Sequence, residues 1–165
     1  MLCPETIMRA QFAKLLHTEM QQNKDIFVLT GDLGYGMWGS IERDFPNRFF
    51  NVGAAEQALL DIGVGLALSG KIPILYSITP FLLFRGFETL RTYVNHENIG
   101  IKLVGSGRDK DYGDDGFSHN AEDDVVFMKK LPNIKLYHPS IENFIWQFDS
   151  FLEAKSPAYI NLTRG

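Results

Sequence analysis

Residues 49–68 read FFNVGAAEQALLDIGVGLAL, and this stretch decides the fold. Its first four residues predict a short apolar strand that breaks at Gly53. The segment that follows, residues 55–68, predicts a helix that is apolar nearly all the way round. A helix that is apolar on every side must be buried on every side, so we expect this one to be enclosed. Its small residues would also let another backbone approach closely.

Glu56 is a single carboxylate at the N-terminal mouth of this helix. A buried carboxylate is costly unless a partner or a hydrogen bond compensates its charge. One interpretation is that Glu56 caps its own helix, where a negative charge suits the helix dipole. The other is that the acid is placed there for chemistry. The spacing alone leaves both interpretations open.

Outward from this stretch, strands and helices alternate along the whole chain. The apolar runs predict six strands, at residues 26–30, 49–52, 73–78, 99–104, 134–137 and 158–162. The helical spacings predict helices at residues 4–22, 40–44, 55–68, 79–94, 121–131 and 141–152. This alternation predicts an α/β fold, a three-layer α/β/α arrangement around a mostly parallel six-stranded sheet.

The length and composition indicate one globular domain that spans residues 1–165. Apolar residues make up 45% of the chain and charged residues 22%, and the net charge is −4. Acidic and basic residues are interspersed, so nothing suggests a nucleic-acid surface. No run is apolar enough to cross a bilayer, and no signal peptide is evident, so we expect a cytoplasmic protein. The single Cys3 excludes an internal disulfide.

Polar residues follow the predicted strands, where ligands bind in parallel sheets. Asp32 follows the first strand, Glu56 the second and Thr79 the third, and a polar loop with the segment 111–119 follows the fourth. A Gly-rich acidic loop of this kind is usually a solvated turn, and it lacks the spacing of a calcium loop. Its His119 could serve as a polar contact for a substrate.

Three phenylalanines recur at every third position of the helix predicted at residues 79–94. They are Phe81, Phe84 and Phe87. Core packing explains such a stripe more often than a platform for a ligand does. Taken alone, the stripe therefore does not identify a site.

Three segments together resemble the pyrimidine-binding domain of transketolases, a thiamine diphosphate-dependent family that includes deoxyxylulose-phosphate synthases. The segments are NVGAAEQ at residues 51–57, SITPFLLFRGF at residues 77–87 and DGFSHNAED at residues 115–123. The resemblance extends from Arg9 to Arg164, nearly the whole chain. It implies the thiamine diphosphate-binding fold of the pyrimidine type.

The resemblance implies that Glu56 hydrogen-bonds the pyrimidine nitrogen N1′ of thiamine diphosphate and promotes the tautomer that activates the cofactor. Glu56 and His119 are then the expected catalytic residues. The remaining cofactor-binding residues would be aromatic side chains around the pyrimidine and a segment on the thiazolium side: Phe81, Phe84, Phe87, Asp32 and Leu33.

The resemblance also implies a sugar or sugar-phosphate substrate. Asp115 and His119 match residues that hydrogen-bond sugar hydroxyls, and Arg9 and Arg164 match two arginines that hold a terminal phosphate. Two further positions depart from the family. Gly36 stands where a phosphate-binding serine is common, and Gly107 stands near the place of a histidine that helps to grip the phosphate. A larger or unphosphorylated sugar therefore remains an alternative substrate.

The family binds the diphosphate and its Mg²⁺ through a separate domain with a Gly-Asp-Gly…Asn motif, and this chain has no such motif. We expect no metal ligand in this chain and a separate diphosphate-binding partner subunit. The start at Met1 favours a split subunit, and the end at Gly165 leaves truncation open. The helices at residues 55–68 and 81–94 should form the interface. The expected assembly is a heterotetramer with two copies of each chain.

The predicted activity is that of a split transketolase subunit, which transfers a two-carbon ketol group between sugars. One alternative keeps the cofactor but condenses pyruvate with an aldehyde, or acts as a 2-oxo-acid dehydrogenase component. Another alternative is a non-catalytic assembly partner. The segment 115–119 resembles a sugar-binding segment, which disfavours the pyruvate and 2-oxo-acid reactions. The intact Glu56 disfavours the non-catalytic assembly partner.

Overall fold

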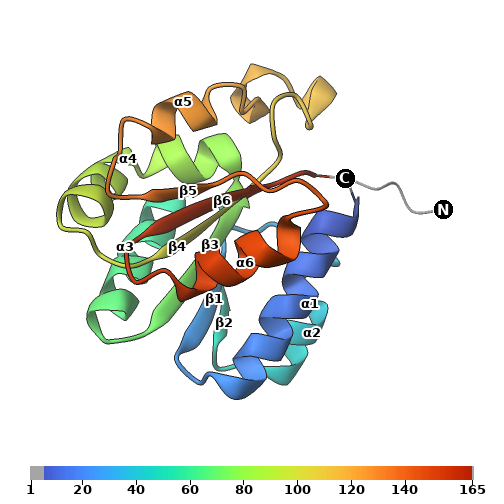
Figure 1. Ribbon diagram of the computed structural model, residues 1–165, viewed down its shortest axis with the longest axis vertical. Coiled ribbons are helices and arrows are strands. Elements are labelled where there is room, and N and C mark those ends of the chain that lie inside the picture. The colour runs from blue at the N-terminus through green and yellow to red at the C-terminus, as the bar shows by residue number, and fades with distance from the viewer. Residues whose placement is uncertain (1–5, 165) are drawn as a thin grey trace.

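The structure is a computed structural model that describes residues 6–164. Its strands are β1 (Ile26–Thr30), β2 (Phe49–Asn51), β3 (Ile72–Ile78), β4 (Lys102–Ser106), β5 (Lys135–Tyr137) and β6 (Ala158–Leu162). Its α-helices are α1 (Thr6–Gln22), α2 (Gly39–Asp44), α3 (Glu56–Leu68), α4 (Phe87–Thr89), α5 (Asp124–Met128) and α6 (Phe144–Glu153). Pro4, which the sequence places in the first helix, lies outside the described residues. Figure 1 shows these elements around one central sheet.

The six strands form a single sheet in the order β2-β1-β3-β4-β6-β5, and every pairing is parallel. The predicted α/β fold with six strands is therefore confirmed, and the mostly parallel sheet is parallel throughout. Parallel neighbours need crossover connections, and the helices supply them. All strands consequently end at the same edge of the sheet.

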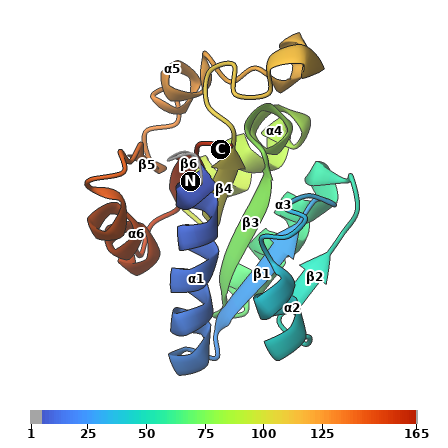
Figure 2. The same ribbon diagram turned by 90° about the vertical axis from the view of Figure 1, so that its right-hand side faces the viewer.

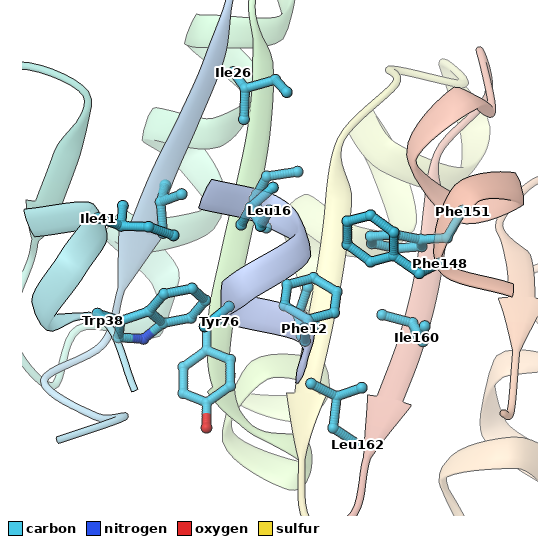
Figure 3. Close-up of a cluster of buried hydrophobic side chains, with 14 of the residues drawn as sticks. Phe12, Leu16, Ile26, Trp38, Ile41, Tyr76, Phe148, Phe151, Ile160 and Leu162 are labelled. Carbon is cyan, nitrogen blue, oxygen red and sulfur yellow. The ribbon is translucent and has the colours of Figure 1, made fainter. Parts of the chain in front are cut away.

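The helices cover both faces, as the predicted three layers require. Figure 2 shows α1 and α6 on one side of the sheet and α3 and α4 on the other. On the first side, helix residues such as Phe12, Leu16 and Phe148 pack against the strand residues Val28 and Ile74. Figure 3 shows Phe12 and Leu16 of α1 in this cluster, with Phe148 and Phe151 of α6.

The second layer uses the alternate residues of the same strands. Leu29, Leu75 and Leu103 point to this face and pack with Leu59 and Leu60 of α3. The side chains of a strand alternate between its two faces, so a buried parallel sheet has a core on each side. No helix within residues 6–164 is long and apolar enough to span a membrane.

Strand β4 lies further along the chain than predicted. The sequence predicts it at residues 99–104, but it spans Lys102–Ser106. Gly105 and Ser106 read as loop residues, yet the strand continues through them because they pair with Ser77 and Ile78 of β3 and with Asn161 and Leu162 of β6. Thr79 and Tyr159 lie so close to Gly105 that no side chain fits there. A Cβ atom at Gly105 would lie 2.5 Å from Thr79 Oγ1 and 2.9 Å from Tyr159 Oη.

The helix predicted at residues 79–94 is wound irregularly. Two π-helical segments, Phe81–Arg85 and Leu90–His96, flank the short helix α4. A π-helical turn closes on the fifth residue along and is therefore wider than an α-helical turn. Residues three positions apart no longer stack on one face, which changes where the phenylalanines point.

Helix α3 is not enclosed as predicted. Leu59, Leu60 and Gly63 are buried on the side of the sheet, but Ile62 is 44% exposed and Leu68 is 72% exposed. The prediction of burial on every side is wrong within this chain. The sheet covers one face of α3 and α4 packs beside it, whereas no element of residues 6–164 covers the face with Ile62 and Leu68.

Candidate active site

The candidate site begins at Glu56, the first residue of α3, which is 2% exposed. Its two carboxylate oxygens have separate partners. The Ser77 hydroxyl at the end of β3 donates to Oε1 at 3.0 Å, and the Arg85 guanidinium donates to Oε2 at 2.9 Å. Both partners lie outside α3, so the carboxylate is held across the site by other elements. Two donors compensate the cost of burying its charge.

Arg85 links Glu56 to an aromatic ring. Its guanidinium carbon lies 3.5 Å from the centre of the Phe81 ring, within reach of a cation–π interaction. The Arg85 side chain remains 46% exposed, while that of Glu56 is 1% exposed. The arginine therefore occupies the solvent side of the buried acid.

From Phe81, aromatic contacts continue along the mouth of the site. His119 packs against Phe81 with ring centres 4.7 Å apart, and against Tyr112 with ring centres 5.5 Å apart. We refer to Phe81, His119 and Tyr112 as the aromatic row. At its far end the Arg164 guanidinium lies 4.4 Å from the centre of the Tyr112 ring. The row thus has an arginine stacked at each end.

The expected substrate residues lie at the Tyr112 end of the aromatic row. Asp115 pairs with Arg164 at 3.6 Å, while His119 accepts or donates a hydrogen bond with Ser118 at 3.0 Å. Asp115 and His119 therefore lie in the same site, and each has a different hydrogen-bond or ion-pair partner. Burial raises the pKa of Tyr112, and the nearby charges of Arg9 and Arg164 act against that rise. Of the two predicted phosphate-binding arginines, Arg164 contacts this phenol directly.

Asp32 is held in the loop after β1 by Asn51 of β2. The Asn51 amide donates to Asp32 Oδ1 at 2.9 Å, and the Tyr35 hydroxyl donates to the same oxygen at 3.1 Å. These two hydrogen bonds, the one from Asn51 first, lower the pKa of Asp32. Asp32 has a positive φ of 59°, a conformation that Asp tolerates better than most residues. Leu33 and Asn51 line a neighbouring cavity of about 200 Å³.

The structure does not gather the three phenylalanines into one cluster. Phe84 and Phe87 both pack on Phe127 of α5, with ring centres 4.9 and 5.5 Å from the Phe127 ring. Phe81 instead lies under Arg85 and His119. The wide π-helical turn separates Phe81 from the other two. Of the three, Phe81 is the one that contacts Arg85, a partner of Glu56.

Sequence reasoning missed three residues of this site. Ser77 and Arg85 bind Glu56, and Tyr112 completes the aromatic row. Ser77 directly precedes Ile78 at the end of a predicted strand, a position that could have marked it. Arg85 and Tyr112 carried no such signal, because their roles depend on the winding of the helix and on the path of the loop.

The buried carboxylate and the aromatic row lie at the carboxyl ends of a parallel sheet, where ligands bind in α/β folds. The chain belongs to the family described as transketolase, pyrimidine binding domain, whose profile matches residues 5–162. Membership implies the use of thiamine diphosphate. The residues present suit its aminopyrimidine, because a buried carboxylate is oriented by a hydroxyl and its arginine partner stacks on the ring of Phe81. Within residues 6–164, no three His, Cys, Asp or Glu side chains gather as a metal site.

Several relatives are subunits or sections of divided transketolases. A subunit of the apulose-4-phosphate transketolase of Actinobacillus succinogenes is 36% identical over 73% of this chain and 39% of its own length. The 6-deoxy-6-sulfo-D-fructose transketolase subunit of Clostridium strain MSTE9 is 29% identical over 95% of this chain and 49% of its own length. A solved split gene transketolase, described as an inactive beta4 tetramer, is 31% identical with a TM-score of 0.83, over 96% of this chain and 51% of that one. The chain thus spans about half, or less, of the length of these relatives.

Proposed function

We propose that this chain is the pyrimidine-binding subunit of a split transketolase, which transfers a two-carbon ketol group from a ketose to an aldose. The observation that carries the proposal is the buried Glu56 carboxylate, held by Ser77 and Arg85 beside the aromatic row. A domain used only for assembly has no need of a buried acid with an aromatic ring beside it. The names of the relatives, which are transketolase subunits, support the same reaction.

In this proposal thiamine diphosphate supplies the carbon nucleophile that cleaves the ketose. This chain orients the aminopyrimidine ring of the cofactor and excludes water from it. Glu56 would hold the ring nitrogen N1′ and exchange a proton with it, while Ser77 fixes the orientation of the carboxylate. Phe81 would exclude water from one side, and Phe84 and Phe87 would do so from further along the helix. Asp32 and Leu33 would line the thiazolium side.

The sugar would lie along the aromatic row. His119 would exchange protons with the hydroxyls of the substrate, because a neutral or protonated imidazole can accept or donate. Asp115 would accept a hydrogen bond from another hydroxyl. Arg9 and Arg164 would bind an anionic group at the far end of the sugar. Two of the relatives carry a phosphorylated and a sulfonated sugar in their names.

The exposed apolar face of α3 is the observation that favours a partner chain in this proposal. Ile62 and Leu68 of α3 and Tyr93 beyond α4 are large apolar residues that no element of residues 6–164 covers. A second copy and a diphosphate-binding subunit with Mg²⁺ would cover them, in a heterotetramer of two copies of each chain. We place this assembly in the cytoplasm.

The test of the proposed function is Glu56→Gln in the complex reconstituted with a diphosphate-binding subunit. The amide keeps the shape of the side chain but cannot exchange the proton, so ketol transfer should fall at least about 100-fold. Sedimentation of the complex should be unchanged. Glu153→Gln, at an exposed position at the end of α6, is the control and should keep full activity. Turnover retained by Glu56→Gln would refute the role of this acid.

A comparison of donors tests the reaction itself. The complex with wild-type chain should turn over a ketose donor with an aldose acceptor and leave pyruvate unused. Turnover of pyruvate or of another 2-oxo acid in place of the ketose would assign the chain to a different thiamine enzyme.

A further inference from the structure

The far end of the aromatic row is organised around Tyr112. Its hydroxyl shares a hydrogen bond of 2.9 Å with the Ser106 hydroxyl at the end of β4. One face of its ring receives the Arg164 guanidinium at 4.4 Å, and the ring also contacts His119. The phenol is thus fixed at its tip while its ring faces the candidate substrate residues.

Gly107 provides the space for the Tyr112 ring. Its φ is +85°, in the left-handed region, and a Cβ atom there would lie 2.3 Å from Tyr112 Cε2 and 2.7 Å from Tyr112 Cδ2. A side chain at position 107 and the ring of Tyr112 therefore exclude each other. In this chain the ring takes the space next to the end of β4 that a side chain at position 107 would otherwise fill.

Arg164 is held on two sides. Tyr112 stacks on the plane of its guanidinium, and Asp115 pairs with Nη1 at 3.6 Å. The backbone N–H of Arg164 also donates to Asp111 Oδ2 at 3.0 Å. A guanidinium that is fixed in its plane keeps its remaining N–H groups aligned for a planar or tetrahedral oxyanion. Since the Arg164 side chain is still 44% exposed, those groups remain accessible.

We propose that Tyr112 is a positioning residue that sets specificity for the far end of the sugar, by stacking on Arg164 and aligning it for a tetrahedral oxyanion. The oxyanion is a phosphate ester or a sulfonate, which share this chemistry. The inference rests on the proposed function, because it takes the sugar to lie along the aromatic row. A neutral hydroxyl end gains little from an aligned guanidinium, so the effect of Tyr112 is confined to anionic ends.

The kinetic test uses the complex with the diphosphate-binding subunit and three ketoses, which end in a phosphate, a sulfonate or a hydroxyl group. Tyr112→Ala should lower kcat/KM at least about tenfold, mainly through KM, for the anionic sugar that the enzyme uses. The neutral ketose should change less than about twofold. Tyr112→Phe keeps the stacked ring and should stay within about threefold of wild type. An equal loss for all ketoses would overturn the proposal.

The matched control is Tyr137→Phe. Tyr137 is also a half-buried tyrosine that bonds a serine, with 2.9 Å between its hydroxyl and the Ser150 carbonyl oxygen, but it lies on β5 away from the row. This variant should behave as wild type with every ketose. The preferred anionic ketose then tells whether the end group is a phosphate or a sulfonate.

A binding experiment on the full chain separates this inference from the proposed function. Inorganic phosphate and methanesulfonate are titrated into the chain while NMR follows the side-chain Nε–H signals of its arginines. The Arg164 signal should shift in wild type and Tyr112→Phe, and Tyr112→Ala should weaken the binding at least about fivefold. If no ketose is turned over but this pattern appears, the proposed function fails and the role of Tyr112 stands. If neither anion shifts the Arg164 signal, the role of Tyr112 fails.

Discussion

At the scale of single residues, the ion pair between Glu56 and Arg85 joins an enclosed group to a half-exposed one. If the arginine is removed, the Ser77 hydroxyl is the one side-chain donor that residues 6–164 still offer to Glu56. A buried carboxylate that loses a charged donor is destabilising, whereas the arginine itself loses little because water already reaches it. The stability of the chain therefore depends on a residue whose functional signal in the sequence was weak.

We expect Arg85→Met to lower the free energy of unfolding by about 1–3 kcal/mol, measured by urea denaturation. Arg91→Met is the matched control, because Arg91 pairs with Glu88 at 4.0 Å on the surface. Its effect should stay below about 0.5 kcal/mol. Adding Glu56→Gln to Arg85→Met should restore most of the loss, since the uncompensated charge is gone. Equal losses in Arg85→Met and Arg91→Met would contradict this account.

The residues of the site could be predicted to different degrees. Glu56 could be singled out because a lone acid before an apolar helix is unusual. Arg85 could not, because it reaches Glu56 from 29 positions along the chain through a π-helical turn that no spacing rule foresees. Tyr112 sits in a loop whose path depends on the left-handed Gly107, so the sequence alone could not bring it to Arg164.

At the scale of elements, helix α3 has two glycines that face opposite ways. A Cβ atom at Gly63 would lie 2.6, 3.0 and 3.2 Å from three atoms of the Leu75 side chain. A Cβ atom at Gly65 would meet nothing within 4 Å. Gly63 therefore allows the close packing of α3 on β3, as expected for one of the small residues, while Gly65 lies on the uncovered face.

We expect Gly63→Ala to lower the free energy of unfolding by about 1–2 kcal/mol, because the displaced leucine outweighs the gain in helix propensity. Gly65→Ala is the control in the same helix and should raise the stability of the isolated chain by up to about 1 kcal/mol. Thermal and urea unfolding check both variants. A Gly63→Ala variant as stable as Gly65→Ala would show that α3 does not pack on β3 in this way.

The sequence predicted the type of every strand and placed most boundaries well, since apolar runs mark buried parallel strands. It failed where long-range packing decides. Strand β4 extends to Ser106 because Gly105 and Ser106 pair with β3 and β6, and these partners are distant in the chain. The predicted burial of α3 on every side was wrong for a related reason. The sequence shows that a helix face is apolar, but it does not show which chain covers that face.

At the scale of the whole molecule, each of the two outer layers leaves a large apolar side chain uncovered. The α3 side exposes Ile62, and the opposite side exposes Ile145 on α6 at 55%. The two isoleucines are thus similarly accessible in the isolated chain. The proposed assembly covers the first and leaves the second in water.

We expect Ile62→Asp to abolish assembly with a diphosphate-binding subunit, as measured by sedimentation velocity, because a buried unpaired carboxylate is costly at an interface. The stability of the isolated chain should change by less than about 0.5 kcal/mol. Ile145→Asp is the control on the opposite face and should assemble as wild type does. Assembly of the Ile62→Asp variant, or loss of assembly in Ile145→Asp, would place the interface elsewhere.

The alternation of side chains along the strands has a consequence for where a substitution acts. Val28 and Ile74 serve the layer of α1 and α6, whereas Leu29 and Leu75 serve the layer of α3. The sheet stands between the two sets, so they share no side chain. A substitution in the α3 layer therefore leaves the side-chain contacts of α1 and α6 with the sheet in place.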